Sequence, residues 1–405
     1  MKRASALLII TLVTCHLSPV TAEAARVEHH DGLPIVYLEG APTELGRQHG
    51  ELLTDDVRRA TATLLGYFRA YLKVPLIRSV AANWWLDRSW AQAKPFVPAD
   101  YLEELRALAS ASGVSLRDLW RFHAVPDRTY ACSGLAVWGR ATSGGRLIHT
   151  RNLDWTIEVG IQRYATVCVV RPAGKHAFVN VGWAGFIGAL TGMNDRQISI
   201  GQIGAETVDA TYAGIPMAFL MRRVLEEADD LDEAVRLIRE APRTVGVNYV
   251  VADAKANRAV VVETTRSHVA VFEADDATEH GVAYARPLPD AVFRADTAVD
   301  AGIRDRQLAS GGNPRAPGLE SPAGSAYEVR YLGQAAGILS RYGRINVEAA
   351  KELAKAAAPS SNVQSVIFAW PELWVANAQG PTRAAYTTYH RLDLRELFAL
   401  DTFED

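Results

Sequence analysis

Three residues of the chain, Cys132, Arg151 and Asp154, carry side chains that could act together in nucleophilic chemistry. β-prone runs lie on either side of Thr142-Ser-Gly-Gly145, which has the composition of a tight turn, so the sequence predicts a hairpin. If the chain folds in the middle of this turn, the antiparallel partner of Cys132 lies near position 155, to within a residue or two. The hairpin would therefore gather a thiol, a guanidinium and a carboxylate at one end.

A thiol beside a fixed cation ionises and reacts more readily, whereas a lone cysteine is more often a small buried apolar residue. The residues alone leave both roles open for Cys132. His149, on the returning strand, is the nearest histidine that could serve as its base, although a papain-like pair has a helix after the cysteine and here a strand is predicted. Cys168 lies in the buried-strand pattern Ala165–Val170, which favours core packing, and a disulfide between the two cysteines would block the chemistry.

The elements that must position these residues follow from the hydrophobic periodicity. Residues 25–131 are predicted to be mostly helical, after one strand at Leu33–Leu38. Strands dominate from Cys132 to about Gly204, and residues 276–326, rich in Ala, Gly, Asp and Pro, are predicted to be loop. The remaining predicted helices are 215–227, 231–240, 327–342 and 347–357, and the remaining strands are 247–252, 259–263, 268–273, 363–369, 373–376 and 384–391. This order suggests an α+β protein with a mainly antiparallel sheet layered by helices.

Composition narrows the class of protein. The chain has 405 residues, 49% of them hydrophobic, which is enough for a large core and excludes a disordered protein. The net charge is −3 with both signs interspersed, so we expect no nucleic-acid partner.

The first residues have the pattern of a targeting segment. Met1-Lys2-Arg3 is basic, Ala4–Val13 is apolar, and Ala22-Glu-Ala24 is a small-x-small cleavage site, so we predict a signal peptide over residues 1–24 and export to the periplasm or the exterior. Threonine before Cys15 fits a lipoprotein signal poorly, which disfavours lipid anchoring. No other run is long and apolar enough to be a membrane span.

Motifs for other chemistries are missing from the sequence. It contains no His-Glu-x-x-His, Cys-x-x-Cys, phosphate-binding loop or Gly-x-Ser-x-Gly pattern. His29-His30 beside Asp31 could bind a metal ion, but their place near the start of the mature chain favours a solvated segment. We therefore expect no metal ion and no cofactor.

An ordered set of short motifs resembles the autoproteolytic acyltransferase family that includes isopenicillin N acyltransferase, within the N-terminal-nucleophile cysteine hydrolases. Choloylglycine hydrolases are more distant relatives. The motifs are Tyr37-Leu-Glu-Gly40, Glu44-Leu-Gly-Arg-Gln-His-Gly50, Cys132-Ser-Gly, Arg151-Asn-Leu-Asp154, Gly192-Met-Asn194, Asn248-Tyr-Val-Val-Ala-Asp253 and Glu263-Thr-Thr265. One block departs from the family, because Arg294-Ala-Asp296 stands where Arg-x-Asn-His is expected.

The resemblance implies a fold and a maturation step. The fold would be a four-layer αββα sandwich. The precursor would cut its own backbone between Ala131 and Cys132, leaving residues 25–131 bound as a small subunit and residues 132–405 as the catalytic chain. The freed α-amine has a pKa near 7.7–8.0 in model peptides, so it could take the proton of its own thiol without a histidine.

The resemblance also implies roles for five side chains around the nucleophile. Arg151 would stabilise the thiolate, Asp154 would orient the new amine, and Asn194 and Asn248 would donate to the oxyanion. Arg330 matches a further arginine of the family. The residues themselves allow other interpretations: an ordinary Arg151–Asp154 ion pair, a turn at Asn194, a cap or bulge at Asn248, and a helix-surface charge at Arg330.

The function predicted from the sequence is an exported, self-processing cysteine amidohydrolase that cleaves small N-acyl amides through an acyl-Cys132 intermediate. An acyltransferase and an inactive binding protein of the same fold are the alternatives. Trp138, Trp155, Trp183 and Phe186 could line an apolar acyl pocket, or could pack in the core.

Overall fold

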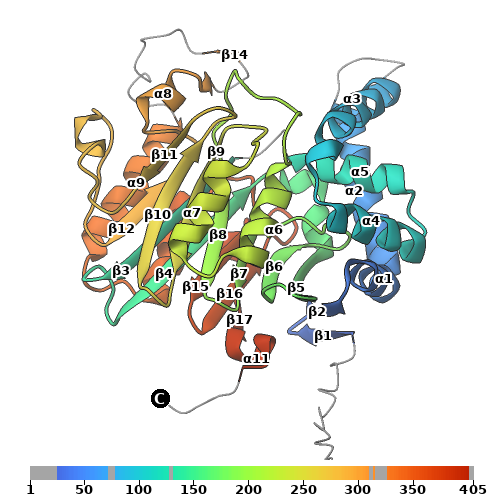
Figure 1. Ribbon diagram of the computed structural model, residues 1–405. Helices are drawn as coiled ribbons and strands as arrows, with labels where there is room; N and C mark the ends of the chain where they lie inside the picture. Colours follow the sequence, from blue (N-terminus) through green and yellow to red (C-terminus); the bar gives the residue numbers. More distant parts are fainter. Residues whose placement is uncertain (1–24, 72–77, 127–130, 310–312, 315–325, 401–405) are drawn as a thin grey trace, which may run out of the picture.

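The computed structural model describes residues 25–71, 78–126, 131–309, 313–314 and 326–400. The predicted signal peptide, with Cys15, lies outside these residues. Within them, two large β-sheets are stacked face to face and each carries helices on its outer face (Figure 1). The chain is therefore a four-layer αββα sandwich of the α+β class, as expected. No helix among the described residues is both long and apolar enough to cross a bilayer.

The first sheet has nine strands within the described residues. Their spatial order is β1 (Arg26–His30), β2 (Leu33–Gly40), β5 (Ala165–Pro172), β6 (Phe178–Trp183), β7 (Thr191–Asn194), β8 (Ile198–Gly204), β9 (Val247–Asp253), β10 (Arg258–Thr264) and β11 (Val269–Phe272). Neighbouring strands are antiparallel except β2 and β5, which are parallel. Helices α6 (Met217–Glu227) and α7 (Leu231–Glu240) cover its outer face.

The second sheet has six strands in the same described part of the chain. They are β12 (Ala291–Arg294), β3 (Ala131–Gly139), β4 (Gly145–Asp154), β15 (Asn362–Ala369), β16 (Glu372–Asn377) and β17 (His390–Asp393). Helices α9 (Ala326–Arg341) and α10 (Val347–Ala357) pack on it, α9 against β12 and α10 against β4 and β15. The two sheets meet where β3 and β4 cross β8.

The segment before Cys132 is built into this sandwich. Its described residues form five α-helices: α1 (Pro42–Leu52), α2 (Thr54–Tyr71), α3 (Arg78–Ala93), α4 (Ala99–Ser112) and α5 (Leu116–Ala124). It also holds two strands where one was expected, and the β1–β2 hairpin forms the end of the nine-stranded sheet. The described part of residues 25–131 is therefore joined to the rest of the chain by strand pairing.

A buried ion network joins this segment to the rest of the chain. Arg222 of α6 contacts Glu104 of α4 and Glu226 of α6, each at 2.7 Å. The Tyr101 hydroxyl of α4 donates to Glu226 at 2.8 Å. These side chains are almost fully buried, so the network would be costly to open.

Helix ends with clear capping residues were predicted well. Helices α7 and α10 have the predicted bounds, and Asp230 and Asn346 cap their first turns by accepting from the backbone N–H groups of Glu233 and Ala349. The predicted 276–326 loop contains the short strand β12, and the predicted strand 384–391 is instead a 3₁₀ turn (Ala384–Tyr386) followed by β17. Short strands without a run of apolar residues give little periodic signal.

Candidate active site

The β3–β4 hairpin brings the predicted residues together. Cys132 pairs with Leu153 and Ala131 with Asp154, which is within two residues of the predicted register. Arg151 pairs with Gly134, so it lies on the same face of the sheet as Cys132, one diagonal step away. Its Nη2 atom donates to the Cys132 Sγ at 3.3 Å.

Space for the Arg151 side chain comes from the opposite sheet. Gly201 of β8 faces it, and a Cβ at this position would lie 2.7 Å from the Arg151 Cγ. Arg151 is fully buried, and its Nη1 has no hydrogen-bond partner among the described residues. A buried guanidinium with a free donor can bind an anion that forms beside it.

Gln202 is a site residue that the sequence analysis missed. Its Nε2 donates to the Cys132 Sγ at 3.4 Å, and its backbone carbonyl accepts from the Arg151 Nε at 3.3 Å. The Gln202 Oε1 is buried without a partner in the described part of the chain. No local motif marks this residue, because its contact with Cys132 depends on how the two sheets stack.

The thiol of Cys132 is protonated in this environment. Burial raises its pKa to about 11, while the Arg151 charge lowers the pKa. The thiol therefore needs a nearby base before it can act as a nucleophile near neutral pH. Cys132 and Cys168 are both free, and Cys168 contacts Thr166 at 3.6 Å within β5.

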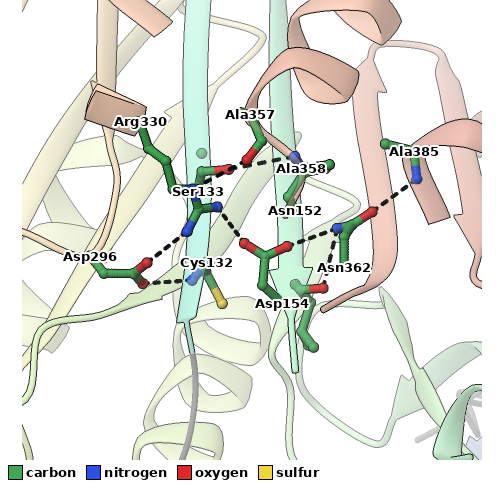
Figure 2. A network of polar contacts seen from close by, with 12 residues as sticks. Cys132, Ser133, Asn152, Asp154, Asp296, Arg330, Ala357, Ala358, Asn362 and Ala385 are labelled. Atoms are coloured by element: carbon green, nitrogen blue, oxygen red, sulfur yellow. Dashed lines mark hydrogen bonds and ion pairs between the residues drawn. The ribbon is translucent and has the colours of Figure 1, made fainter. Parts of the chain in front are cut away.

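The backbone nitrogen of Cys132 has a carboxylate partner of its own. It donates to the Asp296 Oδ1 at 2.6 Å, and Arg330 donates through Nη1 to the Asp296 Oδ2 at 2.8 Å (Figure 2). Arg330 also pairs with Asp154 through Nη2, so one guanidinium joins two carboxylates (Figure 2). Arg330 is therefore part of the site and not a helix-surface charge.

Asp154 lies beside this nitrogen without bonding to it. Its carboxylate accepts from Arg330 and, at 2.9 Å, from Asn362 Nδ2, while Asp296 makes the contact that had been expected of Asp154 (Figure 2). Burial raises the pKa of Asp154 to about 6 and that of Asp296 to about 8, and Arg330 opposes both shifts.

The two asparagines expected to bind an oxyanion are placed differently. Asn248 of β9 lies near the site, where its Nδ2 donates to the carbonyls of Ala295 and Thr297 at 3.4 and 3.1 Å. Asn194 is not brought to Cys132: its Nδ2 donates to the carbonyls of Leu225 and Ala228, at the end of α6. Its Oδ1 accepts from the backbone N–H groups of Arg196 and Ile198, which agrees with the turn interpretation.

His149 has a hydrogen-bond partner other than the thiol. Its Nδ1 contacts the Ser199 Oγ at 2.8 Å across the two sheets, and burial lowers its pKa to about 3. The contacts of this histidine therefore give no support to a cysteine–histidine pair.

An apolar cavity of about 30 Å³ adjoins the cluster. Gln202 and Leu153, the strand partner of Cys132, line it together with three of the four aromatic residues named for an acyl pocket. The lining side chains are Leu64, Phe122, Val125, Pro126, Leu153, Trp155, Ile161, Trp183, Phe186, Leu190 and Gln202. Trp138 is not among them.

Within the αββα sandwich, Cys132 is the second residue of β3, with an arginine at its sulfur and a carboxylate at its nitrogen. Residues 140–281 match the model of the family described as acyl-coenzyme A:6-aminopenicillanic acid acyl-transferase. The match confirms the resemblance found in the motifs.

Curated relatives agree with this assignment. The chain is 29% identical over 276 residues to Protein dcd1B of Dictyostelium discoideum, which covers 63% of this chain and 54% of that protein. It is 23% identical over 252 residues to the N-acylethanolamine-hydrolyzing acid amidase of Cavia porcellus, covering 60% and 65% of the two chains. The chain thus spans about half to two-thirds of the length of these relatives.

Two solved structures share less sequence identity with the chain than these relatives do. The N-acylethanolamine-hydrolyzing acid amidase ortholog of Caenorhabditis elegans is 16% identical with a TM-score of 0.42, covering 59% of this chain and 92% of that one. A conjugated bile acid hydrolase from Clostridium perfringens is 12% identical with the same TM-score, covering 65% and 93%.

Proposed function

We propose that the protein is a self-cleaving cysteine amidohydrolase that acts on N-acyl amides through an acyl-Cys132 intermediate. The observation that carries the proposal is the contact of the Cys132 sulfur with Arg151 and with Gln202, which lines an apolar cavity. The names of the curated relatives, N-acylethanolamine-hydrolyzing acid amidase and acid ceramidase, support an acyl amide as the substrate class.

Self-cleavage supplies the missing base. Scission between Ala131 and Cys132 converts a backbone amide into an α-amine, whose pKa near 8 in model peptides suits proton transfer at neutral pH. The amine takes the proton of its own thiol, and the thiolate attacks the substrate carbonyl. The resulting ammonium group protonates the departing amine as the C–N bond breaks, and water then hydrolyses the thioester to release the acid. Arg151 faces the charge that forms on sulfur, and the donors of Gln202 face the oxygen of the tetrahedral intermediate.

The small volume of the cavity limits the size of the acyl group that the uncut chain could bind. Its volume of about 30 Å³ holds roughly two water molecules, so an acyl chain needs the wall to move. Val125 and Pro126 line the wall just before the proposed cut, so cleavage removes their covalent link to Cys132. Residues 25–131 then remain bound through the β1–β2 hairpin and the buried Arg222 network.

Export is part of the proposal. Residues 1–24 have the basic, apolar and small-residue regions of a signal peptide, which suit a periplasmic or secreted enzyme. A mature protein beginning near Ala25 would support export, and retention of Met1 would contradict it.

Activity on a panel of N-acyl amides tests the proposed reaction. The panel varies the acyl chain and the amine, and the measurements are release of the free acid and the mass of the Cys132 fragment during turnover. We expect acid release with an added acyl mass, and neither in Cys132→Ala. Hydrolysis that survives Cys132→Ala would refute the proposal.

An acyltransferase is the second candidate, favoured by the name of the matching family model. The same assay distinguishes it when a free amine is added. If the new amide forms faster than the acid, transfer is the main reaction; if acid release is unchanged, the enzyme is a hydrolase.

A further inference from the structure

We propose that Asp296, and not Asp154, is the carboxylate that binds the α-amino group of Cys132 after cleavage and sets the pH range in which the enzyme works. This inference rests on the proposed function, because the amine exists only if the chain cuts itself. It assigns a role to the block Arg294-Ala-Asp296, where the sequence departs from its family.

The contact already exists in the uncut chain. The Asp296 Oδ1 lies 2.6 Å from the nitrogen of Cys132, and its Oδ2 accepts from Arg330 at 2.8 Å. Both oxygens accept hydrogen bonds, as those of a carboxylate can. In the uncut chain burial raises the pKa of Asp296 to about 8, and an ammonium ion at the Cys132 nitrogen would lower that pKa again. The oxygens of Asp154 accept instead from Arg330 and Asn362.

The loop that carries Asp296 is held on both sides. Asn248 donates to the two carbonyls flanking Asp296, and Gln307 Nε2 donates to the carbonyl of Asp296 itself at 2.7 Å. Glu263 accepts two backbone N–H groups further along the loop, at 2.8 Å each. All three side chains are buried, so the carboxylate has little freedom to leave the nitrogen.

Cleavage changes the charge on the nitrogen that Asp296 contacts. A backbone amide is neutral, whereas an α-amine can become an ammonium ion. A carboxylate at hydrogen-bond distance favours the ammonium form and raises the pKa of the amine by about 1 to 3 units. Asp296 therefore changes from a hydrogen-bond acceptor into an ion-pair partner when the chain is cut.

Other charged groups also face this nitrogen. Arg151 and Asp154 come from β4, Arg330 from α9, and the thiol belongs to Cys132 itself. The two arginines favour the neutral amine. Asp154 and Asp296 both pair with Arg330, so the direct contact with the nitrogen is what distinguishes Asp296. Without the charge of Asp296, cationic groups predominate and the pKa of the amine falls.

The loss of activity at low pH depends on the charge of the Cys132 amine. The amine must be neutral to accept the thiol proton, so activity is lost as the pH falls through the pKa of the amine. Asp296→Asn lowers that pKa and moves the acid limb of the pH profile to lower pH. Asp154→Asn is the matched control, because it removes a buried carboxylate from the same Arg330 without touching the nitrogen.

The experiment measures kcat/KM against pH for cleaved wild type, Asp296→Asn and Asp154→Asn, using an N-acyl amide that the wild type hydrolyses. We expect the acid limb of Asp296→Asn to move down by about 1 to 3 pH units. We expect the limb of Asp154→Asn to stay near that of the wild type, whatever its rate. A limb that moves in Asp154→Asn and stays in Asp296→Asn would overturn the inference.

Two further variants test the same inference if Asp296→Asn does not fold. Asp296→Ser removes the same charge from a smaller side chain, and Gln307→Met releases the loop while keeping every charge. Both should move the limb in the same direction, and an unmoved limb in either folded variant counts against the inference. An active, cleaved wild type with unmoved variants refutes the inference alone, whereas an uncut, inactive wild type refutes the proposed function as well.

Discussion

The side-chain amide of Gln202 in one sheet lies 3.4 Å from the Cys132 sulfur in the other. This contact joins the two sheets at the reacting atom. Removing it by Gln202→Leu should lower kcat by about 10²- to 10³-fold, the usual cost of one oxyanion donor. Steady-state kinetics on the cleaved enzyme measure the loss, and Gln202→Glu, which keeps the shape but not the donors, should lose about as much. If both variants keep the wild-type kcat, Gln202 takes no part in catalysis.

Asn194 should behave in the opposite way. Its Nδ2 donates to the carbonyls of Leu225 and Ala228, and its Oδ1 accepts from the backbone N–H of Ile198. Asn194→Ala leaves these buried groups unpaired, so we expect the free energy of unfolding to fall by about 1 to 3 kcal/mol. Chemical denaturation measures this loss, and kcat of the folded variant should stay within a few-fold. A kcat loss like that of Gln202→Leu, without a stability change, would restore the oxyanion role.

Arg151 should control the reactivity of the thiol. Its charge lowers the pKa of Cys132 against a strong effect of burial, so Arg151→Gln raises the pKa of the thiol further. Alkylation of Cys132 by a small maleimide, followed against pH in the cleaved protein, should show the thiolate appearing at higher pH. Arg146→Gln is the control, because Arg146 lies on the same strand, is exposed, and pairs with Glu372 at the surface. An equal shift in both variants would mean that the contact of Arg151 with the Cys132 sulfur does not control the pKa of the thiol.

Low pH should weaken the packing of helix α1, which carries His49, against the two-sheet sandwich. His49 accepts from the backbone N–H of Gly185 at 2.9 Å, and burial lowers its pKa to about 4. A depressed folded-state pKa means that the stabilisation is complete above about pH 6.5 and is lost as the pH falls toward 4. We expect the midpoint of thermal unfolding to fall over this window, and the fall to be smaller in His49→Gln. The exposed His280→Gln is the control, and an unchanged slope in His49→Gln would contradict the assignment.

The sequence predicted the parts of the site that depend on local chain geometry. A tight turn and two β-prone runs were sufficient to bring Arg151 to Cys132, and hydrophobic periodicity was sufficient to define α7 and α10. Gln202 and Asp296 could not be found in this way. Gln202 reaches the sulfur only because the two sheets stack, and Asp296 follows β12, a four-residue strand inside a segment of loop composition.

Asn194 was expected beside Cys132 and is found elsewhere, for a related reason. A short motif matched the family, but a motif does not say which side of a strand the residue faces or what it meets there. The structure places it at the end of α6, while Asn248, from a comparable motif, holds the loop of Asp296 beside the nucleophile. Motif position predicted the neighbourhood of Asn248 but not the atoms it contacts.

N-terminal sequencing of the purified protein tests the central claim most directly. We predict two fragments that stay together under native conditions, the larger beginning at Cys132, and a single uncut chain in Cys132→Ala. A larger fragment that begins at any other residue, or a wild-type chain that stays whole, would contradict the account.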